Sequence, residues 1–191
     1  MKNDRRINRT KKLLTNAFIA LLLEKNLNEI TVKELCEKAD INRGTFYLHY
    51  QDIYDLKQQL ENDIHKQLND IMDSLPDTLN TDNTQKMFLY LFAFFENNRQ
   101  LLKAFLGPNG DISFQKKTQT LFRERYLNIL LRDTKVGNIT NIDYSYNFIA
   151  SGFTALIETW LNEETPPSLE EMAKLTNKIV FDGLLSIFSN L

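Results

Sequence analysis

The sequence predicts an all-α protein. Its 191 residues include only 6 Gly and 4 Pro, too few for the many tight turns of a strand-rich fold. Apolar residues recur at spacings of three and four over most of the chain, which is the period of amphipathic helices. Hydrophobic residues make up 42% and charged residues 25% of the chain, as in ordinary globular domains, so the composition excludes an intrinsically disordered or fibrous protein.

Several classes of protein are excluded by simpler counts. The single cysteine, Cys36, rules out an intramolecular disulfide and a cysteine-based zinc site in this chain. The longest apolar runs, AFIALLL from Ala17 and MFLYLFAFF from Met87, are shorter than the roughly 18 residues of a membrane span. The N-terminus is charged and lacks the apolar region of a signal peptide. We therefore expect a cytoplasmic protein with no membrane partner.

Positive charge is concentrated at the N-terminus although the net charge is −2. Residues 1–50 contain 10 Lys and Arg against 6 Asp and Glu. Among the first 12 residues a single acid, Asp4, faces the basic residues Lys2, Arg5, Arg6, Arg9, Lys11 and Lys12. Such a cluster suits a phosphate backbone, and the alternative is a solvated, poorly ordered chain end.

Two helices are predicted in the first forty residues. The first covers Thr10 to Lys25, where leucines and other apolar residues recur at helical spacing. The second begins after Thr31, which with Glu34 three residues later forms a capping-box pattern. Cys36 lies on the apolar stripe of this second helix, so we interpret it as a small core residue and not as a reactive thiol.

A third short helix, RGTFYLHY, follows Asn42, which can cap it. Two short helices and a tight turn form the helix-turn-helix pattern, in which the second helix enters the major groove of DNA. We expect Phe46 and Tyr50 to pack inward and Gly44 to permit close approach of the backbone to DNA. The polar candidates for contact with DNA are Arg43, Thr45, Tyr47 and His49. An ordinary helical hairpin is the alternative.

The segment TVKELCEKADINRGTFYLHYQDIYDL resembles the helix-turn-helix signature of the tetracycline-repressor (TetR) family, and the resemblance covers roughly residues 8–60. It implies an N-terminal three-helix DNA-binding domain, residues 1–52. A C-terminal helical bundle for ligand binding and dimerisation, residues 53–191, would follow. Together, residue pattern and resemblance give the expected DNA-contacting set: Lys11, Lys12, Thr31, Asn42, Arg43, Gly44, Thr45, Tyr47 and His49.

One position departs from the family pattern. Ile53 stands where the family often has a lysine that contacts phosphate at the start of the fourth helix. That anchor is therefore either absent or replaced by Lys57.

The resemblance implies a sequence-specific DNA-binding regulator that acts as a ligand-responsive repressor and binds a palindromic double-stranded operator as a homodimer. The alternative is a helical ligand-binding or architectural DNA-organising protein without promoter-specific regulation. An enzyme is not expected, because the only two histidines, His49 and His65, lie near no triad and the chain has no phosphate-loop pattern. We likewise expect no catalytic residue, cofactor or metal.

The C-terminal two-thirds is predicted to be a helical bundle. A long fourth helix runs from Ile53 to Pro76 and is followed by a polar loop, Asp77–Asn83. The next segment, KMFLYLFAFFENN, is apolar on every face and is predicted to be the core helix. The remaining predicted helices cover Ser113–Arg132, Asp143–Glu163 and Ser168–Asn190, the last with Ser168 and Glu171 as a capping box.

A ligand pocket is expected where bulky aromatic residues leave a gap, between the helices that carry Phe92, Phe95, Phe122 and Tyr126. Its ligand would be a small, mostly apolar molecule. The alternative is that these rings are simply core residues.

A homodimer is expected on the last two predicted helices, because each has two apolar faces and only one can pack on its own domain. Gly152 and Ala155 would let paired helices approach closely. The predicted interface residues are Phe153, Trp160, Leu184 and Phe188.

Overall fold

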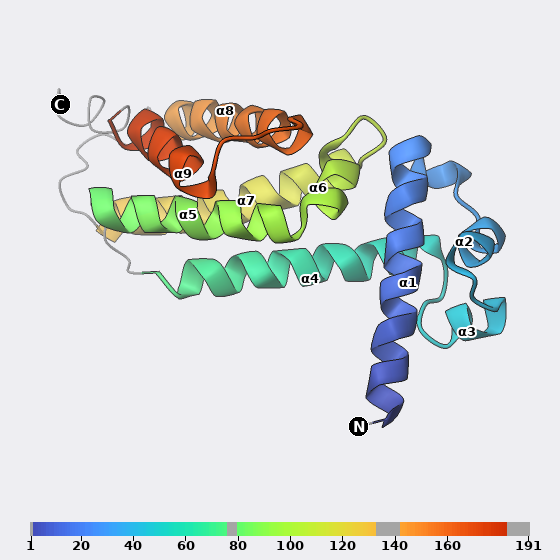
Figure 1. The fold of residues 1–191 in the computed structure, drawn as a ribbon. Coiled ribbons are helices and arrows are strands. Elements are labelled where there is room, and N and C mark those ends of the chain that lie inside the picture. The colour runs from blue at the N-terminus through green and yellow to red at the C-terminus, as the bar shows by residue number, and fades with distance from the viewer. Residues whose placement is uncertain (1, 76–79, 133–141, 183–191) are drawn as a thin grey trace. The chain divides into compact units, whose positions relative to one another are not determined.

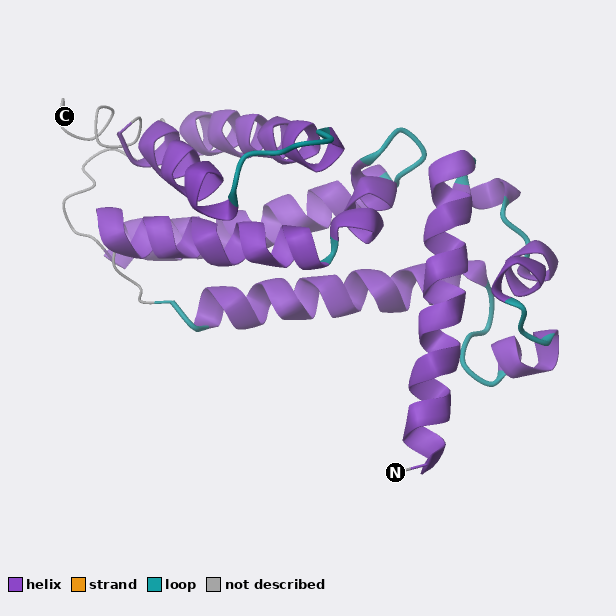
Figure 2. Cartoon of the chain, viewed as in Figure 1, coloured by secondary structure: helices purple, strands orange, loops and turns teal. Residues whose placement is uncertain are grey.

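The computed structural model describes residues 2–75, 80–132 and 142–182, and every regular element in these ranges is a helix (Figures 1 and 2), which confirms the all-α prediction. The first helices are α1 (Lys2–Glu24), a 3-10 turn (Leu27–Glu29), α2 (Val32–Ala39), α3 (Arg43–Tyr47) and α4 (Ile53–Asp73). They are followed by α5 (Thr81–Asn97), α6 (Arg99–Leu106), α7 (Ile112–Arg132), α8 (Ile142–Asn162) and α9 (Leu169–Asn177), which continues into a π-helical turn (Lys178–Asp182). None of these helices, over the described residues, is long and apolar enough to cross a membrane.

The chain forms two compact units. The N-terminal unit consists of residues 1–64 and 100–114, and the C-terminal unit consists of residues 65–99 and 115–191. The segment that contains α6 therefore packs with the N-terminal helices although it follows α5 in the sequence.

The core of the N-terminal unit forms where α1 and α3 pack against α2. Phe18, Leu35 and Phe46 are fully buried there, and Cys36 is buried beside them, as predicted. Burial raises the pKa of the Cys36 thiol, which keeps it in the unreactive protonated form. The turn after α2 is made at Asp40, whose left-handed backbone (φ 53°) lets the Ile41 N–H reach the Cys36 carbonyl at 2.9 Å.

Helix α1 begins earlier than the sequence predicted. It starts at Lys2 instead of Thr10, so the basic cluster is part of the helix. From Arg5, where the described side chains begin, the first buried one is Thr10. The preceding turns of α1 extend past α2 and α3 (Figure 1) and carry exposed arginines, Arg5, Arg6 and Arg9.

A buried cation links α4 to the turn before α7 within the N-terminal unit. The Lys57 ammonium lies 2.7 Å from a carboxylate oxygen of fully buried Glu61 and donates to Asp111 at 2.8 Å. Burial alone lowers the pKa of Lys57, but the bonds to Asp111 and Glu61 outweigh it and the pKa is raised. The hydrogen bond from Lys57 holds the pKa of Asp111 well below its usual range. The turn needs Gly110, since a Cβ there would lie 2.0 Å from the Phe105 carbonyl oxygen.

In the C-terminal unit α5 is the core helix, as predicted, and lies between the C-terminal part of α4 and α9 (Figure 1). Its start differs from the prediction that Asp77–Asn83 is a loop. The Asn80 side chain accepts a hydrogen bond from the Asn83 N–H at 2.8 Å, and this cap makes Thr81–Asn83 the first turn of the helix. A buried bond of 2.6 Å from the Thr84 hydroxyl to Asn177 ties α5 to α9.

Candidate nucleic-acid interface

The start of α2 is fixed by a cap that forms only in part as predicted. The Thr31 hydroxyl accepts a hydrogen bond from the Glu34 N–H at 3.2 Å. The reciprocal bond of a capping box is replaced, because the Glu34 carboxylate binds the Lys25 ammonium at 2.5 and 2.7 Å. Glu34 therefore ties α2 to the residue that follows the end of α1.

The start of α3 is fixed by Asn42, whose side-chain oxygen accepts a hydrogen bond from the Gly44 N–H at 2.7 Å, as the sequence predicted. A Cβ on Gly44 would lie 3.2 Å from that oxygen, so the absence of a side chain also serves the cap. Phe46 and Tyr50 pack inward, which confirms the prediction for both. Burial raises the pKa of Tyr50 to about 12, and its phenol stays protonated.

The polar residues predicted to contact DNA lie on and around α3. Arg43 and Tyr47 are exposed, and Thr45 and His49 are half-buried. The Lys11 ammonium lies 5.9 Å from the centre of the Tyr50 ring, which brings the basic part of α1 beside the end of α3. Lys12 and Thr31 are exposed as well, although the Thr31 hydroxyl is used by its cap. These side chains form one candidate surface for DNA.

The start of α4 contains the two positions considered for a phosphate anchor, Ile53 and Lys57. Lys57 cannot replace the missing phosphate anchor, because it is buried and bound to Glu61 and Asp111. Ile53 is itself a core residue, so the chain uses this position for packing. Of the two alternatives left by the sequence, the structure supports an absent anchor.

One exposed residue beside α3 was missed because only polar side chains were considered. Leu48 directly follows α3, and 80% of its surface is exposed. Leu48 lies four residues after Gly44, so both are on the same side of the helix. This spacing could have identified Leu48 from the sequence.

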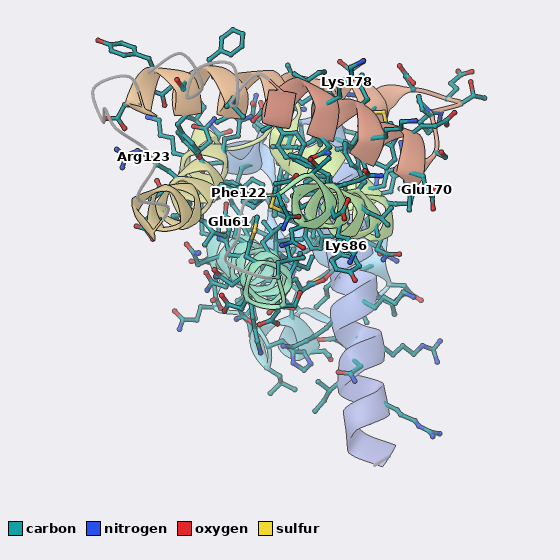
Figure 3. All side chains as sticks on the ribbon, turned by 90° about the vertical axis from the view of Figure 1, so that its left-hand side faces the viewer. Glu61, Lys86, Phe122, Arg123, Glu170 and Lys178 are labelled. Atoms are coloured by element: carbon teal, nitrogen blue, oxygen red, sulfur yellow. The ribbon has the colours of Figure 1, made fainter. Side chains whose placement is uncertain are left out.

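Two of the four aromatic residues expected around a ligand, Phe92 and Phe95, pack against each other. Phe92 is fully buried, and its ring centre lies 5.9 Å from that of Phe95, 6.2 Å from Phe153 and 5.3 Å from Trp160. Phe92 and Phe95 are therefore buried in the aromatic core of the C-terminal unit. Phe122 is half-buried on α7 (Figure 3), and the Tyr126 side chain lies outside the described residues.

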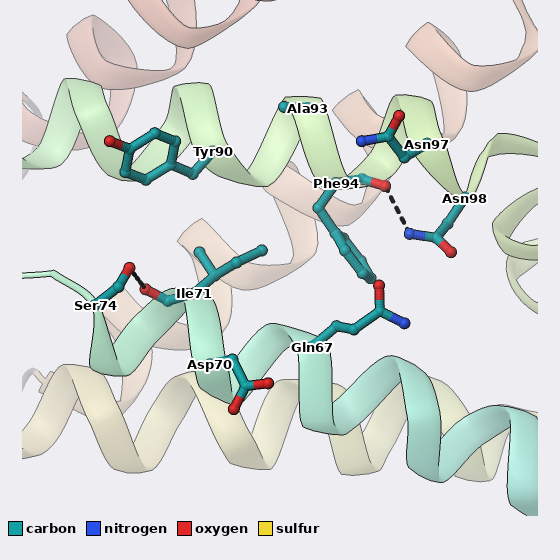
Figure 4. Close-up of a pocket in the computed structure, with 9 residues that line it drawn as sticks. All are labelled: Gln67, Asp70, Ile71, Ser74, Tyr90, Ala93, Phe94, Asn97 and Asn98. Atoms are coloured by element: carbon teal, nitrogen blue, oxygen red, sulfur yellow. Dashed lines mark hydrogen bonds between the residues drawn. The ribbon is translucent and has the colours of Figure 1, made fainter. Parts of the chain in front are cut away.

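A hollow of about 500 Å³ lies elsewhere, between α4 and α5 (Figure 4). Its apolar residues are Ile71, Tyr90, Ala93 and Phe94. Its polar residues are Gln67, Asp70, Ser74, Asn97 and Asn98. A second hollow, of about 270 Å³, lies between α5 and α9, where Lys86 and Glu170 are among the lining residues (Figure 3). Phe92, Phe95 and Phe122 line neither hollow.

Helix α8 has one buried and one exposed apolar stripe, and the predicted interface residues fall on the buried one. Trp160 is 2% exposed, and the Arg99 guanidinium stacks 4.5 Å from its ring centre and donates to the Leu161 carbonyl. Phe153 packs on Phe88. Trp160 thus belongs to the core of the C-terminal unit in the single chain, and half-buried Phe153 packs against that core. Leu184 and Phe188 lie outside the described residues. The exposed stripe consists of Tyr144, Phe148, Gly152 and Ala155.

No group of three or more His, Cys, Asp or Glu side chains in the described part of the chain could hold a metal ion.

Comparison with known proteins gives a family and a fold. The family described as "Transcriptional regulator C-terminal region" (TetR_C_8) matches residues 82–182, more than half of the chain. An uncharacterized HTH-type transcriptional regulator, YxbF from Bacillus subtilis (strain 168), is 27% identical over 170 residues. That match covers 86% of this chain and 43% of YxbF, so the chain spans less than half the length of this curated relative.

Solved structures share the fold at low identity. A TetR transcriptional regulator from Streptococcus agalactiae 2603V has a TM-score of 0.62 at 24% identity, with 94% of this chain and 98% of that chain covered. The fatty acid degradation regulator FadR from Bacillus halodurans has a TM-score of 0.69 at 12% identity, with 92% and 96% covered. FadR from Bacillus subtilis, solved in complex with stearoyl-CoA, has a TM-score of 0.60 at 14% identity, with 90% and 98% covered. These structures share the fold, and the matching C-terminal region shows that the chain belongs to the TetR family of transcriptional regulators.

Proposed function

We propose that the chain is a ligand-responsive repressor that binds a palindromic operator as a homodimer, with residues 1–52 as the DNA-binding part and residues 53–191 for ligand and dimerisation. One observation carries the DNA-binding part of the proposal. A short helix, α3, is capped at its start and presents exposed Arg43 and Tyr47 beside the basic helix α1. Arginine can bind guanine through two hydrogen bonds, and the lysines and arginines of α1 suit phosphates.

Selection of binding sites from random duplexes tests this directly. The purified chain should enrich a sequence with two-fold symmetry and half-sites about 34 to 36 Å apart. Its affinity for that duplex should exceed its affinity for scrambled DNA by a factor on the order of 1,000 or more and should fall as salt rises. Equal affinity for all duplexes would instead support the architectural alternative. A gel shift with the DNA upstream of the chain's own gene then asks whether the operator lies there.

The exposed stripe of α8 supports dimerisation. Phe148 is 81% exposed, and it shares the stripe with Tyr144, Gly152 and Ala155. A monomer rarely leaves such an apolar patch in water, and pairing with a second copy would cover it. Nothing lies within 4 Å of the position of a Cβ on Gly152, so a second helix could approach closely there. We therefore propose that the interface is still formed by the last two predicted helices, and that its central residue on α8 is Phe148 and not Trp160.

Sedimentation equilibrium tests this interface. Phe148→Asp should yield monomers with unchanged helical content, and these should lose operator binding. Ile112→Asp is the matched control, because Ile112 is an exposed apolar residue at the start of α7 and is not a member of the stripe. A wild-type monomer at micromolar concentration, or a dimer undisturbed by Phe148→Asp, would contradict the proposal.

The hollow between α4 and α5 is the proposed ligand site. It has an apolar wall formed by Ile71, Ala93 and Phe94 (Figure 4), and α4 is a continuous helix that begins in the N-terminal unit. A ligand that moves α4 could therefore alter DNA affinity. The 9 lining residues include Asp70 and no Lys or Arg, which favours a mostly apolar molecule that is neutral or cationic. An anionic ligand such as the stearoyl-CoA bound to Bacillus subtilis FadR is disfavoured.

A thermal-shift screen followed by measurement of operator release tests the ligand site. Compounds that stabilise the wild type should lower its DNA affinity. Ala93→Trp should fill the hollow and abolish both effects while operator binding without ligand persists. Stabilisation that survives Ala93→Trp would place the ligand at another site.

A further inference from the structure

Leu48 occupies an unusual position for a large apolar residue. It is 80% exposed, and among the large apolar side chains in the described part of the chain only Phe148 has a higher exposed fraction. The backbone around Leu48 is nevertheless held in place. Its own conformation is helical (φ −74°, ψ −17°), and the N–H groups of His49 and Tyr50 bind the Phe46 carbonyl at 2.9 and 3.0 Å. The leucine side chain is therefore presented on a fixed backbone.

The neighbours of Leu48 make this side of α3 accessible to a large partner. Leu48 lies four residues after Gly44 and three after Thr45, so the three positions share one side of the helix. Gly44 has no side chain, and the residues on either side of Leu48 are Tyr47 and His49, both in the candidate DNA surface. The other side of α3 is occupied by buried Phe46.

A leucine side chain cannot bind a phosphate or form a hydrogen bond with a base edge. The apolar group that the major groove presents is the C5-methyl of thymine. We infer that Leu48 is a specificity-determining residue that packs against one thymine methyl in each operator half-site. This inference rests on the proposed function, in which α3 reads the operator. It adds a contact by which the protein distinguishes thymine from cytosine at a position that Arg43 does not read.

The test removes a single methyl group from the DNA. In the selected operator, each thymine of the half-site is replaced in turn by deoxyuridine, which keeps the base pair and loses only the C5-methyl. At one position the replacement should lower the affinity of the protein for the operator about fourfold per half-site. This is the value expected when one apolar carbon group is removed from a contact. Replacement of the other thymines should have little effect.

A double-mutant cycle then assigns that methyl to Leu48. Leu48→Ala should weaken binding to the thymine operator, and the deoxyuridine penalty at that position should disappear in the variant. Tyr47→Phe is the matched control from the adjacent residue. It should weaken binding to the thymine operator and to the deoxyuridine operator by the same factor, so the deoxyuridine penalty should be the same in Tyr47→Phe as in the wild type. Since Leu48 is exposed, Leu48→Ala should keep the wild-type circular dichroism and melting temperature.

The possible failures are distinguishable. If the wild type binds every duplex equally, the proposed function is overturned and the Leu48 contact with it. If the wild type selects an operator but no deoxyuridine changes its affinity, or if Leu48→Ala keeps the full deoxyuridine penalty, the Leu48 contact alone is overturned. Leu48 would then belong to a surface for another protein or a second copy of this chain.

Discussion

The helix-turn-helix and the core of the C-terminal unit are fixed by interactions of different sequence range. In the helix-turn-helix, the caps join residues two or three positions apart, such as Asn42 with Gly44 and Thr31 with Glu34. In the C-terminal unit, the bonds that define the core join distant segments. The Thr84 hydroxyl reaches Asn177, 93 positions away, and Arg99 reaches the Leu161 carbonyl, 62 positions away. The first kind of contact can be recognised in a sequence, whereas the second kind depends on how the helices pack.

The largest expected effect is in the aromatic core of the C-terminal unit. Phe92→Ala should lower the free energy of unfolding by about 3 to 5 kcal/mol, because it opens a cavity among Phe95, Phe153 and Trp160. Tyr54→Ala is the control, since Tyr54 is an exposed aromatic residue in the N-terminal unit and should change stability by less than about 0.5 kcal/mol. Urea unfolding followed by circular dichroism measures both. Equal costs would mean that the rings of α5 are not interlocked.

The next effect concerns two ion pairs with identical spacing. Lys57 with Glu61 and Lys33 with Glu37 are both four residues apart on a helix, but the first pair is buried and the second is exposed. Lys57→Met should destabilise the chain by about 3 kcal/mol because it leaves buried Glu61 without this cation, and Lys33→Met should cost less than about 0.5 kcal/mol.

The double variant Lys57→Met with Glu61→Met sharpens the comparison. Replacing both charges with apolar groups should recover most of the stability lost in Lys57→Met. Failure to recover would indicate that the bond from Lys57 to Asp111, and not the buried pair, provides the stability.

On DNA, Arg43 and Tyr47 should behave differently although both are exposed on α3. Arg43→Ala should cost about 1 to 3 kcal/mol in binding and relax specificity at one base position. Tyr47→Phe, like Lys11→Ala, should weaken binding to all sequences, and Lys11→Ala should also reduce the slope of affinity against salt. Titration of each variant against single-base variants of the operator decides the matter. Equal loss on operator and scrambled DNA for Arg43→Ala would exclude base reading by Arg43.

The smallest expected effect is the loss of stability when the side chain of a helix cap is removed, and it can be compared between the two units. In the C-terminal unit Ser168 and Glu171 form the complete box that the sequence predicted, whereas Glu34 in the N-terminal unit binds Lys25. Ser168→Ala and Thr31→Ala should each cost about 1 kcal/mol at pH 7.

Only the Ser168 cap should depend on acid pH through its reciprocal carboxylate. Hydrogen bonds from the Ser168 backbone and hydroxyl lower the pKa of Glu171 below its ordinary value of 4.5. The corresponding stabilisation is therefore present above pH 4.5 and is lost as the pH falls through the lowered pKa. The difference in melting temperature between wild type and Ser168→Ala should narrow as the pH falls through that pKa but should not vanish, because the Ser168 hydroxyl still accepts a hydrogen bond from the Glu171 N–H. A difference independent of pH would show that the bond from the Ser168 hydroxyl to the Glu171 carboxylate does not contribute.

The sequence by itself determined the parts of the molecule that depend on local chemistry. The scarcity of Gly and Pro and the helical spacing of apolar residues established the all-α class. Asn42 established the start of α3, and the spacing of Phe46 and Tyr50 established its inward side. These features were predictable because a cap or an apolar stripe involves residues within about one helical turn.

Tertiary packing decided which of several equivalent faces is buried. The sequence indicated two apolar stripes on α8, but only packing on Phe92 and Arg99 places Trp160 inside and leaves Phe148 exposed. It likewise gave no sign that Lys57 would be buried, because its partner Asp111 is 54 positions away. Periodicity states that a face is apolar, whereas the neighbour that covers this face comes from a distant part of the chain.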